Sequence, residues 1–363
     1  MRILHMIPDI GISNGVMSVI LNYAKAMPDD IKFDVIYFAE KDKTRKADIE
    51  ALGGRVYKTD VPSPKSLLLG KMSAFFRQHK GEWQALHIHC PHFAVFIAPF
   101  AKAAGIKKIA VHCHSTVYSL KGSQKRNQLL SLYAKYFIKT KIACSNEAGR
   151  LWYGGKKYTV LNNGIDCDKY KFSQSGRELI RKELNIDENA FAVGHIGRTD
   201  VPQKNHSFIL KVFDEIKKQK DNSVLLLAGA EESAETKELA KKLGIENSVY
   251  YLGVRQDVNC LLSAMDTFIF PSTKEGLPVS VIEAQASGLN VLISDSVTKE
   301  CAVTNLAEFK SLNDSLSLWA SAVISNTALH SERSIACEKV KSAGWDIYCL
   351  LYTSPSPRDL STS

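Results

Sequence analysis

The segment TFIFPSTKEGLPVSVIEAQASG, residues 267–288, joins a short apolar strand pattern to a helical pattern through a Gly-Leu-Pro loop. The strand part is β-branched and aromatic, and apolar residues recur at helical spacing until a closing glycine. A strand followed by a loop and a helix is the repeating unit of a parallel sheet covered by helices, so the segment predicts an α/β fold. It also places Glu275 at the carboxyl end of a strand and Glu283 a little over one turn into the next helix.

The same alternation extends over the whole chain and predicts two doubly wound halves, 1–165 and 166–348. The strands predicted in the first half are 2–7, 33–38, 85–89, 108–112, 141–145 and 158–161. Those of the second half are 191–198, 223–229, 249–253, 267–272 and 290–295. Between the halves, NNGIDCDKYKFSQSG loses periodicity and is the predicted linker. Ligands of open α/β sheets bind outside the carboxyl ends of the strands, so we expect a binding cleft between the two halves.

Length and composition favour an ordinary globular protein of two domains. The chain has 363 residues, of which 45% are hydrophobic and 23% charged. The first residues, MRILHMIPDI, resemble a buried strand more than a secretory signal, and the eight cysteines include no C-x-x-C pair. We therefore expect reduced thiols, a cytoplasmic location and no transmembrane helix.

The charge is unevenly distributed along the chain. Residues 1–165 hold 25 Lys and Arg against 11 Asp and Glu, whereas the remainder hold 22 against 27. Solvated lysines that keep the protein soluble are one explanation; a face for anionic lipid or a phosphate-bearing acceptor is the other. We expect peripheral contact with the inner face of the cell membrane. Nucleic acid is not an expected partner, because the basic residues are not interleaved with a stacking platform.

Two cations follow the first strand of the second half. Neither half has the G-x-G-x-x-G or P-loop fingerprint, which disfavours dehydrogenases and P-loop enzymes. Arg198 and Lys204 instead suit a diphosphate, and the amides after Gly276 and Leu277 open a helix, where negative charge is favoured. The alternative is purely structural: Glu275 starts a helix, and Glu283 and the lysine are solvated.

The order and spacing of several motifs resemble one enzyme family. They are NGVMSVILNYA, NNGID, G-R-x(5)-K-N-H, LLLAGAEE, LGVRQDV and FPSTKEGLPVSVIEAQASG with its E-x7-E spacing. Over about Met1 to Ile347 the chain is similar to family 4 of the retaining glycosyltransferases, closest to its capsule and exopolysaccharide branch. The resemblance implies the GT-B fold: two Rossmann-like domains facing a central cleft, the first on the acceptor side and the second binding a nucleotide sugar.

The resemblance also implies roles for residues of the second half. Glu275 would contact the donor sugar, and Glu283 would hold the ribose hydroxyls of the nucleotide. Arg198 and Lys204 would neutralise the donor diphosphate with the amides of Gly276 and Leu277. Val254 and Arg255 would line the pocket for the base.

In the first half, the resemblance places Gly15 in the loop that approaches the phosphate, and His114 beside the reacting sugar. Asn14 stands where the family usually has another glycine, and Met17 where an acidic residue is common. These departures leave open a donor-binding subunit with weakened catalysis.

Two groups of residues imitate metal sites. HIHCPH and HCH gather five histidines and two cysteines, but His87 and His89, like His112 and His114, alternate along a strand, so each pair shares one face at a strand end. The D-x-D pattern of Asp166 and Asp168 lies in the predicted linker. We expect no metal site and no cofactor.

The predicted activity is transfer of a sugar from a nucleoside diphosphate sugar, UDP-linked by expectation, to a lipid-linked saccharide with retention. A sugar-nucleotide epimerase or hydrolase of the same fold is the alternative enzyme. The last segment, 349–363, loses the apolar period and contains two X-Pro steps, so we expect a non-native or disordered tail there.

Overall fold

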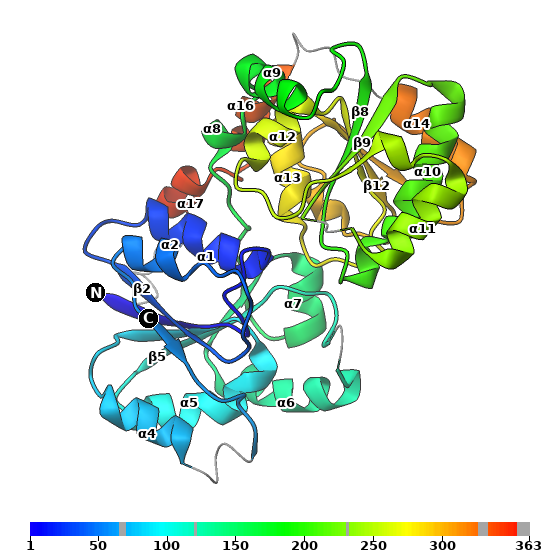
Figure 1. Ribbon diagram of the computed structural model, residues 1–363. Helices are drawn as coiled ribbons and strands as arrows, with labels where there is room; N and C mark the ends of the chain where they lie inside the picture. The colour runs from blue at the N-terminus through cyan, green and yellow to red at the C-terminus, as the bar shows by residue number, and fades with distance from the viewer. Residues whose placement is uncertain (65–69, 120–121, 230–231, 326–332, 354–363) are drawn as a thin grey trace. The chain divides into compact units, whose positions relative to one another are not determined.

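The computed structural model of the chain describes residues 1–64, 70–119, 122–229, 232–325 and 333–353. These residues form two compact units, drawn in Figure 1. The first unit comprises Met1–Gly164 together with the segment from Ile347, and the second comprises Ile165–Asp346. The division after Gly164 lies one residue before the boundary expected from the sequence. No helix among the described residues has both the length and the apolar character to cross a bilayer.

The sheet of the first unit has seven strands in the order β3-β2-β1-β4-β5-β6-β7, all paired in parallel. Its strands are β1 Arg2–Met6, β2 Lys32–Tyr37, β3 Val56–Lys58, β4 Ala85–Ile88, β5 Lys108–Cys113, β6 Thr140–Ala143 and β7 Thr159–Val160. Both faces are covered by helices, which is why β1 and β2 are almost continuously buried rather than buried at alternate residues. The sequence patterns predicted these strands except β3, a three-residue edge strand.

The helices of the first unit lie on both faces of its sheet. They are α1 Gly15–Ala26, α2 Lys46–Ala51, α4 Lys71–Gln78, α5 Ala94–Ala103, α6 Gln124–Phe137, α7 Asn146–Tyr153 and the short η1 Pro91–Phe93. Figure 1 shows α1 and α2 on one face of the sheet and α4, α5 and α6 on the other. On the α1 face, Ile3 and Ile7 of the first strand segment pack against Met17 and Ile20 of α1.

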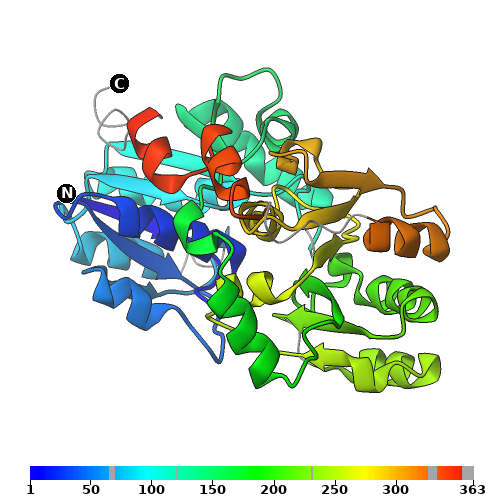
Figure 2. The same cartoon turned by 90° about the horizontal axis from the view of Figure 1, so that it is seen from above.

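The last described segment returns to the first unit as helix α17, Ile347–Thr353, which lies alongside α1 (Figures 1 and 2). Ile347 and Leu350 are buried, and both approach Gly164 so closely that a Cβ there would lie 2.7 Å from Leu350. The expectation of a poorly packed tail from Cys349 therefore does not hold for Leu350. Residues 354–363, with both X-Pro steps, lie outside the described residues.

The second unit repeats the same plan with six parallel strands in the order β10-β9-β8-β11-β12-β13. Its strands are β8 Phe191–Ile196, β9 Ser223–Ala228, β10 Val249–Tyr251, β11 Thr267–Phe270, β12 Asn290–Ser294 and β13 Ala307–Lys310. Its helices are α8 Cys167–Tyr170, α9 Gln174–Glu183, α10 His206–Gln219, α11 Ala234–Leu243, α12 Val258–Ala264, α13 Val279–Ala286, α14 Leu316–Ser325 and α16 Ala336–Ser342, with short η2 Pro202–Lys204, η3 Glu246–Ser248 and η4 Lys299–Cys301. The prediction missed the edge strand β13, but the α/β prediction is confirmed.

The predicted linker contains a short helix. Asp166 caps α8 by accepting a hydrogen bond from the amide of Lys169, and Asp168 forms a 2.7 Å ion pair with Lys341. The D-x-D pattern is therefore a helix start belonging to the second unit.

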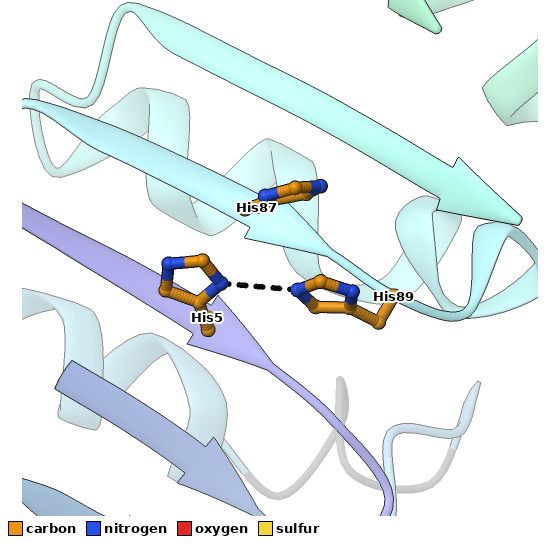
Figure 3. A group of neighbouring side chains, drawn as sticks. All are labelled: His5, His87 and His89. Atoms are coloured by element: carbon orange, nitrogen blue, oxygen red, sulfur yellow. Dashed lines mark hydrogen bonds between the residues drawn. The ribbon is translucent and has the colours of Figure 1, made fainter. Parts of the chain in front are cut away.

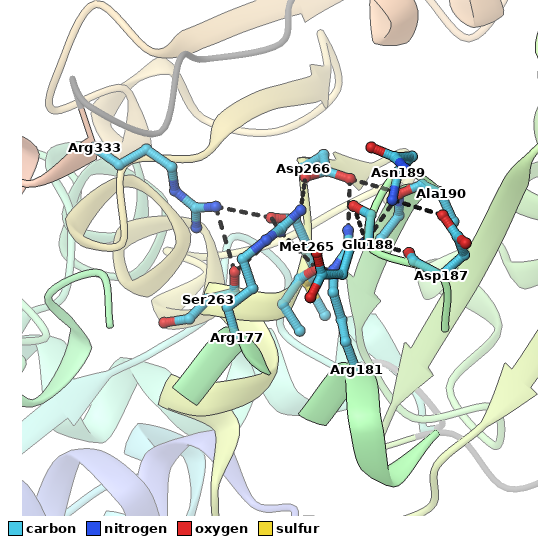
Figure 4. A network of polar contacts seen from close by, with 12 residues as sticks. Arg177, Arg181, Asp187, Glu188, Asn189, Ala190, Ser263, Met265, Asp266 and Arg333 are labelled. Carbon is cyan, nitrogen blue, oxygen red and sulfur yellow. Dashed lines mark hydrogen bonds and ion pairs between the residues drawn. The ribbon is translucent and has the colours of Figure 1, made fainter. Parts of the chain in front are cut away.

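A buried ion-pair network fixes the entry into β11. Asp266 precedes that strand and binds Arg177 and Arg181 of α9 at 2.8 and 2.9 Å, while its Oδ2 also accepts from the amide of Ala192 in β8 at 2.8 Å (Figure 4). Arg333 lies beside them and donates to the carbonyl of Met265 at 2.8 Å. All four charged side chains are buried. The network ties α9, β8 and β11 together.

Candidate active site

The carboxyl ends of β8 and β11 mark the point in the second sheet where strand order reverses. The chain leaves β8 toward β9 on one side, and β11 lies on the other. Ligands of open α/β sheets bind at such a switch point. The loops after the two strands are joined: Thr273 donates its amide to the carbonyl of Gln203 at 2.9 Å, and the Asn205 side chain donates to the carbonyl of Pro271 at 3.2 Å. These two hydrogen bonds hold the loop after β8 against the loop after β11.

Lys204 and Glu275 meet across these joined loops. The Lys204 Nζ lies 2.8 Å from Oε1 of Glu275, and each side chain is 18% exposed. The same Nζ stands 4.7 Å from the centre of the Phe270 ring, a cation–π contact at the end of β11. A cation and a carboxylate are thus held side by side, partly shielded from water, where charge interactions are stronger than in bulk solvent.

Helix α13 begins directly after this loop. Pro278 is its N-cap in extended conformation, so the amides of Val279 and the residues after it open toward the loop. Glu283, on the first turns of α13, accepts a hydrogen bond from the Tyr170 side chain of α8. Burial raises the pKa of the Glu283 carboxyl, and the hydrogen bond from Tyr170 acts in the opposite direction. Glu283 is therefore a positioned, half-buried carboxylate and not a solvated helix residue.

The two arginines predicted for the second unit have ion-pair partners within that unit. Arg198 forms a two-pronged pair with Asp200. Arg255 binds Glu183 of α9 at 2.6 Å and Asp257 at 2.7 Å, and these bonds raise the pKa of Arg255. Val254 beside it is half-buried. The structure therefore brings Lys204 and Glu275 into contact, and holds Arg198 and Arg255 in ion pairs of their own.

In the first unit, Gly15 begins α1 directly after β1 and its loop. Asn14 caps this helix: its Oδ1 accepts from the amides of Val16 and Met17 at 3.0 and 3.2 Å. A Cβ at Gly15 would meet nothing within 4 Å. Packing among the described residues thus does not require a glycine, and the space beside Gly15 is compatible with a close-lying ligand. Asn14 replaces a second glycine with a side chain that satisfies the helix amides.

His114 ends a chain of hydrogen-bonded imidazoles. Its Nε2 lies 2.9 Å from Nδ1 of His89, whose Nε2 lies 3.0 Å from Nδ1 of His5. Burial lowers the pKa of His114 to about 3, with a further contribution from His87. At neutral pH the ring is uncharged and holds one proton, so it can donate or accept a hydrogen bond but carries no positive charge.

Sequence patterns did not single out three residues that support this site: Tyr170, Phe270 and Asn205. Tyr170 lies in the predicted linker, more than a hundred positions before the glutamate it binds. Phe270 resembled an ordinary strand residue. Asn205 has a left-handed backbone with φ of 60°, which its place in the K-N-H motif could have suggested, because asparagine tolerates that conformation well.

A family match covers most of the second unit. Residues 176–308 match the family described as "Glycosyl transferases group 1". The Bacillus subtilis (strain 168) protein EpsF, whose name describes it as a glycosyltransferase, is 28% identical over 95% of this chain and 93% of its own length. An Escherichia coli protein named UDP-Gal:alpha-D-GlcNAc-diphosphoundecaprenol alpha-1,3-galactosyltransferase is 24% identical over 62% of this chain and 61% of its own.

A solved structure extends the match to the whole fold. HepE of Anabaena, crystallised in complex with UDP-glucose, superposes with a TM-score of 0.81 at 20% identity, covering 100% of both chains. The two parallel-stranded Rossmann-like units are therefore the GT-B fold, as the sequence resemblance predicted.

Proposed function

Because the chain belongs to the group 1 glycosyltransferases, we propose that it moves a sugar from a UDP-sugar to a hydroxyl of a lipid-linked saccharide, with retention at the anomeric carbon. The observation that carries the proposal is the Lys204–Glu275 pair at the switch point of the second sheet. The UDP-glucose bound to HepE and the diphosphoundecaprenol in the name of the Escherichia coli relative support the donor and the acceptor.

In the proposed reaction the bond between the anomeric carbon and the diphosphate oxygen breaks, and its electron pair leaves with UDP. The acceptor hydroxyl forms the new bond on the same face and gives its proton to the departing phosphate oxygen. Lys204 and the opening amides of α13 stabilise the charge that develops on the diphosphate. Glu275 orients the donor sugar, Glu283 holds the ribose, and neutral His114 hydrogen-bonds the reacting sugar.

The direct test incubates the protein with single UDP-sugars and an undecaprenyl-diphosphate-linked saccharide. A screen of nucleotide sugars for thermal stabilisation selects the donor, because a ligand at 100 times its Kd adds about 2.7 kcal/mol to the unfolding free energy. NMR of the product then gives the anomeric configuration. Free sugar or epimerised donor without acceptor dependence would support the alternative enzyme; an inverted linkage would refute retention.

Substitution of the two glutamates should affect different kinetic quantities. Glu283→Ala should weaken UDP binding, because it removes the carboxylate that Tyr170 positions on α13. Glu275→Ala should leave the Kd for UDP nearly unchanged and lower kcat, because it faces the sugar rather than the nucleotide. Calorimetric titration with UDP and steady-state kinetics separate the two effects.

Tyr170→Phe provides a graded control for this division of roles. It keeps the ring and removes the hydroxyl bonded to Glu283, so UDP should bind more weakly than to the wild type but more tightly than to Glu283→Ala. Equal losses of UDP affinity in Glu275→Ala and Glu283→Ala would show that the two carboxylates do not have separate tasks.

We propose further that the first unit contacts the anionic membrane surface through helix α6. Its Leu129 and Phe137 are each 67% exposed, with Tyr136 at 58%. Exposed Lys125 and Arg126 lie on the same helix. Apolar side chains flanked by basic ones are typical of helices that lie in a membrane interface. The excess of basic residues in the first half has the sign that anionic lipids attract.

Phe137→Glu should reduce binding to vesicles that contain anionic lipid, measured by co-sedimentation, and added salt should weaken wild-type binding through screening. Leu179→Glu is the matched control, because Leu179 is 61% exposed on α9 of the second unit. Equal wild-type binding to neutral and anionic vesicles, or equal effects of the two substitutions, would contradict this membrane contact.

A further inference from the structure

Five histidines gather on one face of the first sheet at its carboxyl edge: His5, His87, His89, His112 and His114. His5 of β1 stands in register with His87 of β4, and His89 follows two residues later on the same side. His112 and His114 follow from β5 with the same alternation. The sheet reverses its strand order between β1 and β4, so the cluster occupies a switch point of the first unit.

Three of these rings converge on one place. Figure 3 shows His5 and His89 facing each other at the ends of β1 and β4, with the ring of His87 beside them; the His87 ring stacks on that of His89, with centroids 4.2 Å apart. One nitrogen from each ring lies within 4.8 Å of the other two. His5 Nδ1 and His89 Nε2 face each other at 3.0 Å. Two imidazole nitrogens bound to one tetrahedral zinc at about 2.0–2.1 Å are about 3.3 Å apart, so the pair needs to open by only a few tenths of an ångström.

Several ring nitrogens in the cluster are buried without a protein partner. Among the described residues, none hydrogen-bonds Nε2 of His5, Nε2 of His87 or either nitrogen of His112. Buried polar atoms in native proteins are nearly always satisfied by protein, water or an ion, so these nitrogens point to a bound species. Five adjacent imidazoles are far more than packing needs, because each costs desolvation that an apolar side chain would avoid.

The side chains gathered here favour one class of metal ion. The three groups are imidazoles and not carboxylates, which favours Zn²⁺ or Co²⁺ over Mg²⁺ or Ca²⁺.

We propose that His5, His87 and His89 bind a divalent transition metal of the zinc type, contrary to the expectation from the sequence. The ion lies between Nδ1 of His5 and Nε2 of His89, where a proton lies in its absence, and each neutral ring keeps one proton on its other nitrogen. When Nε2 of His89 ligates the metal, its Nδ1 must carry the proton and donate to Nε2 of His114 across the 2.9 Å contact. The metal thereby fixes the tautomer of His114, with its own proton on Nδ1, as outer-shell bonds do at other metal-bound histidines.

The test measures metal in protein purified without a polyhistidine tag. After dialysis against metal-free buffer, elemental analysis should find about one zinc per chain, as expected for a three-histidine site whose fourth position is taken by water. Cobalt-substituted protein should show the intense visible absorption of a tetrahedral Co²⁺ site. His87→Gln should lower the retained metal at least about tenfold and abolish the cobalt band, because it removes a ligand.

His92→Gln is the matched control, since His92 is a half-buried histidine of the same sheet edge that lies outside the triad. It should retain metal and the cobalt band. Wild-type protein that takes up no cobalt with a tetrahedral spectrum would overturn the proposal even if His87→Gln fails to fold, and so would equal metal retention in His87→Gln and His92→Gln. Waters would then be the partners of the buried nitrogens. Metal content is measured without sugar transfer, so this outcome is independent of the proposed activity.

Discussion

Lys204→Ala should lower kcat by at least about 10²-fold, because it removes the cation proposed to stabilise the leaving diphosphate. The fold should survive, since Lys204 is a partly exposed residue whose main contacts are Glu275 and the face of Phe270. Single-turnover measurements with saturating donor separate this loss from weaker binding. Lys211→Ala, an exposed lysine on α10, is the control and should keep wild-type turnover.

The ion pair between Lys204 and Glu275 allows a double-variant test of the same role. Lys204 and Glu275 are in direct contact, so their contributions to turnover should be coupled. The double variant should lose less activity than the product of the two single losses, because residues in contact are not additive. A Lys204→Ala enzyme within threefold of wild type, or fully multiplicative losses in the double variant, would remove Lys204 from its proposed role.

The sequence predicted the strands and helices that have strong local patterns. The strand patterns around β8, β9, β11 and β12 are confirmed. The misses were β3 and β13, which read VYK and AEFK. Each is a short edge strand of three or four residues with polar members, so its existence depends on a neighbouring strand rather than on its own periodicity.

The site could be predicted only as far as its motifs reach. The sequence predicts Lys204 and Glu275 each on a loop after a strand of the second half, and the structure shows them in contact because β8 and β11 are neighbours in the sheet. Tyr170 was not foreseen, because its bond to Glu283 joins distant segments that no local pattern connects. The convergence of His5 with His87 and His89 also escaped prediction. It requires knowing that β1 pairs with β4 in a register that aligns His5 with His87.

The network of Arg177, Arg181 and Asp266 could not be predicted from any sequence pattern. Arginine at spacing i, i+4 on a polar helix is typical of a solvated face, yet both guanidinium groups are buried. They satisfy the end of α12 by donating to its carbonyls: Arg177 and Arg181 reach the carbonyl of Ala264 at 3.0 and 3.1 Å. A buried cation of this kind is stable only while its counter-charge is present.

Asp266→Asn should therefore destabilise the second unit by about 3–5 kcal/mol, because it leaves two buried guanidinium groups without their carboxylate. For a unit of this size, 1 kcal/mol corresponds to about 2–4 °C in Tm, so we expect a drop of about 10 °C in its melting transition. Differential scanning calorimetry is the measurement, and any loss of activity at low temperature should be small, because the substitution touches no proposed substrate contact.

Asp221→Asn is the matched control, because Asp221 is a fully exposed partner of Lys217 in the same unit, where an ion pair contributes at most about 1 kcal/mol. A melting transition of Asp266→Asn close to that of Asp221→Asn would mean that the carbonyls of α12 and of the loop before β8 are enough to hold the arginines. A large drop would instead identify Asp266 as the group that locks β8 to β11.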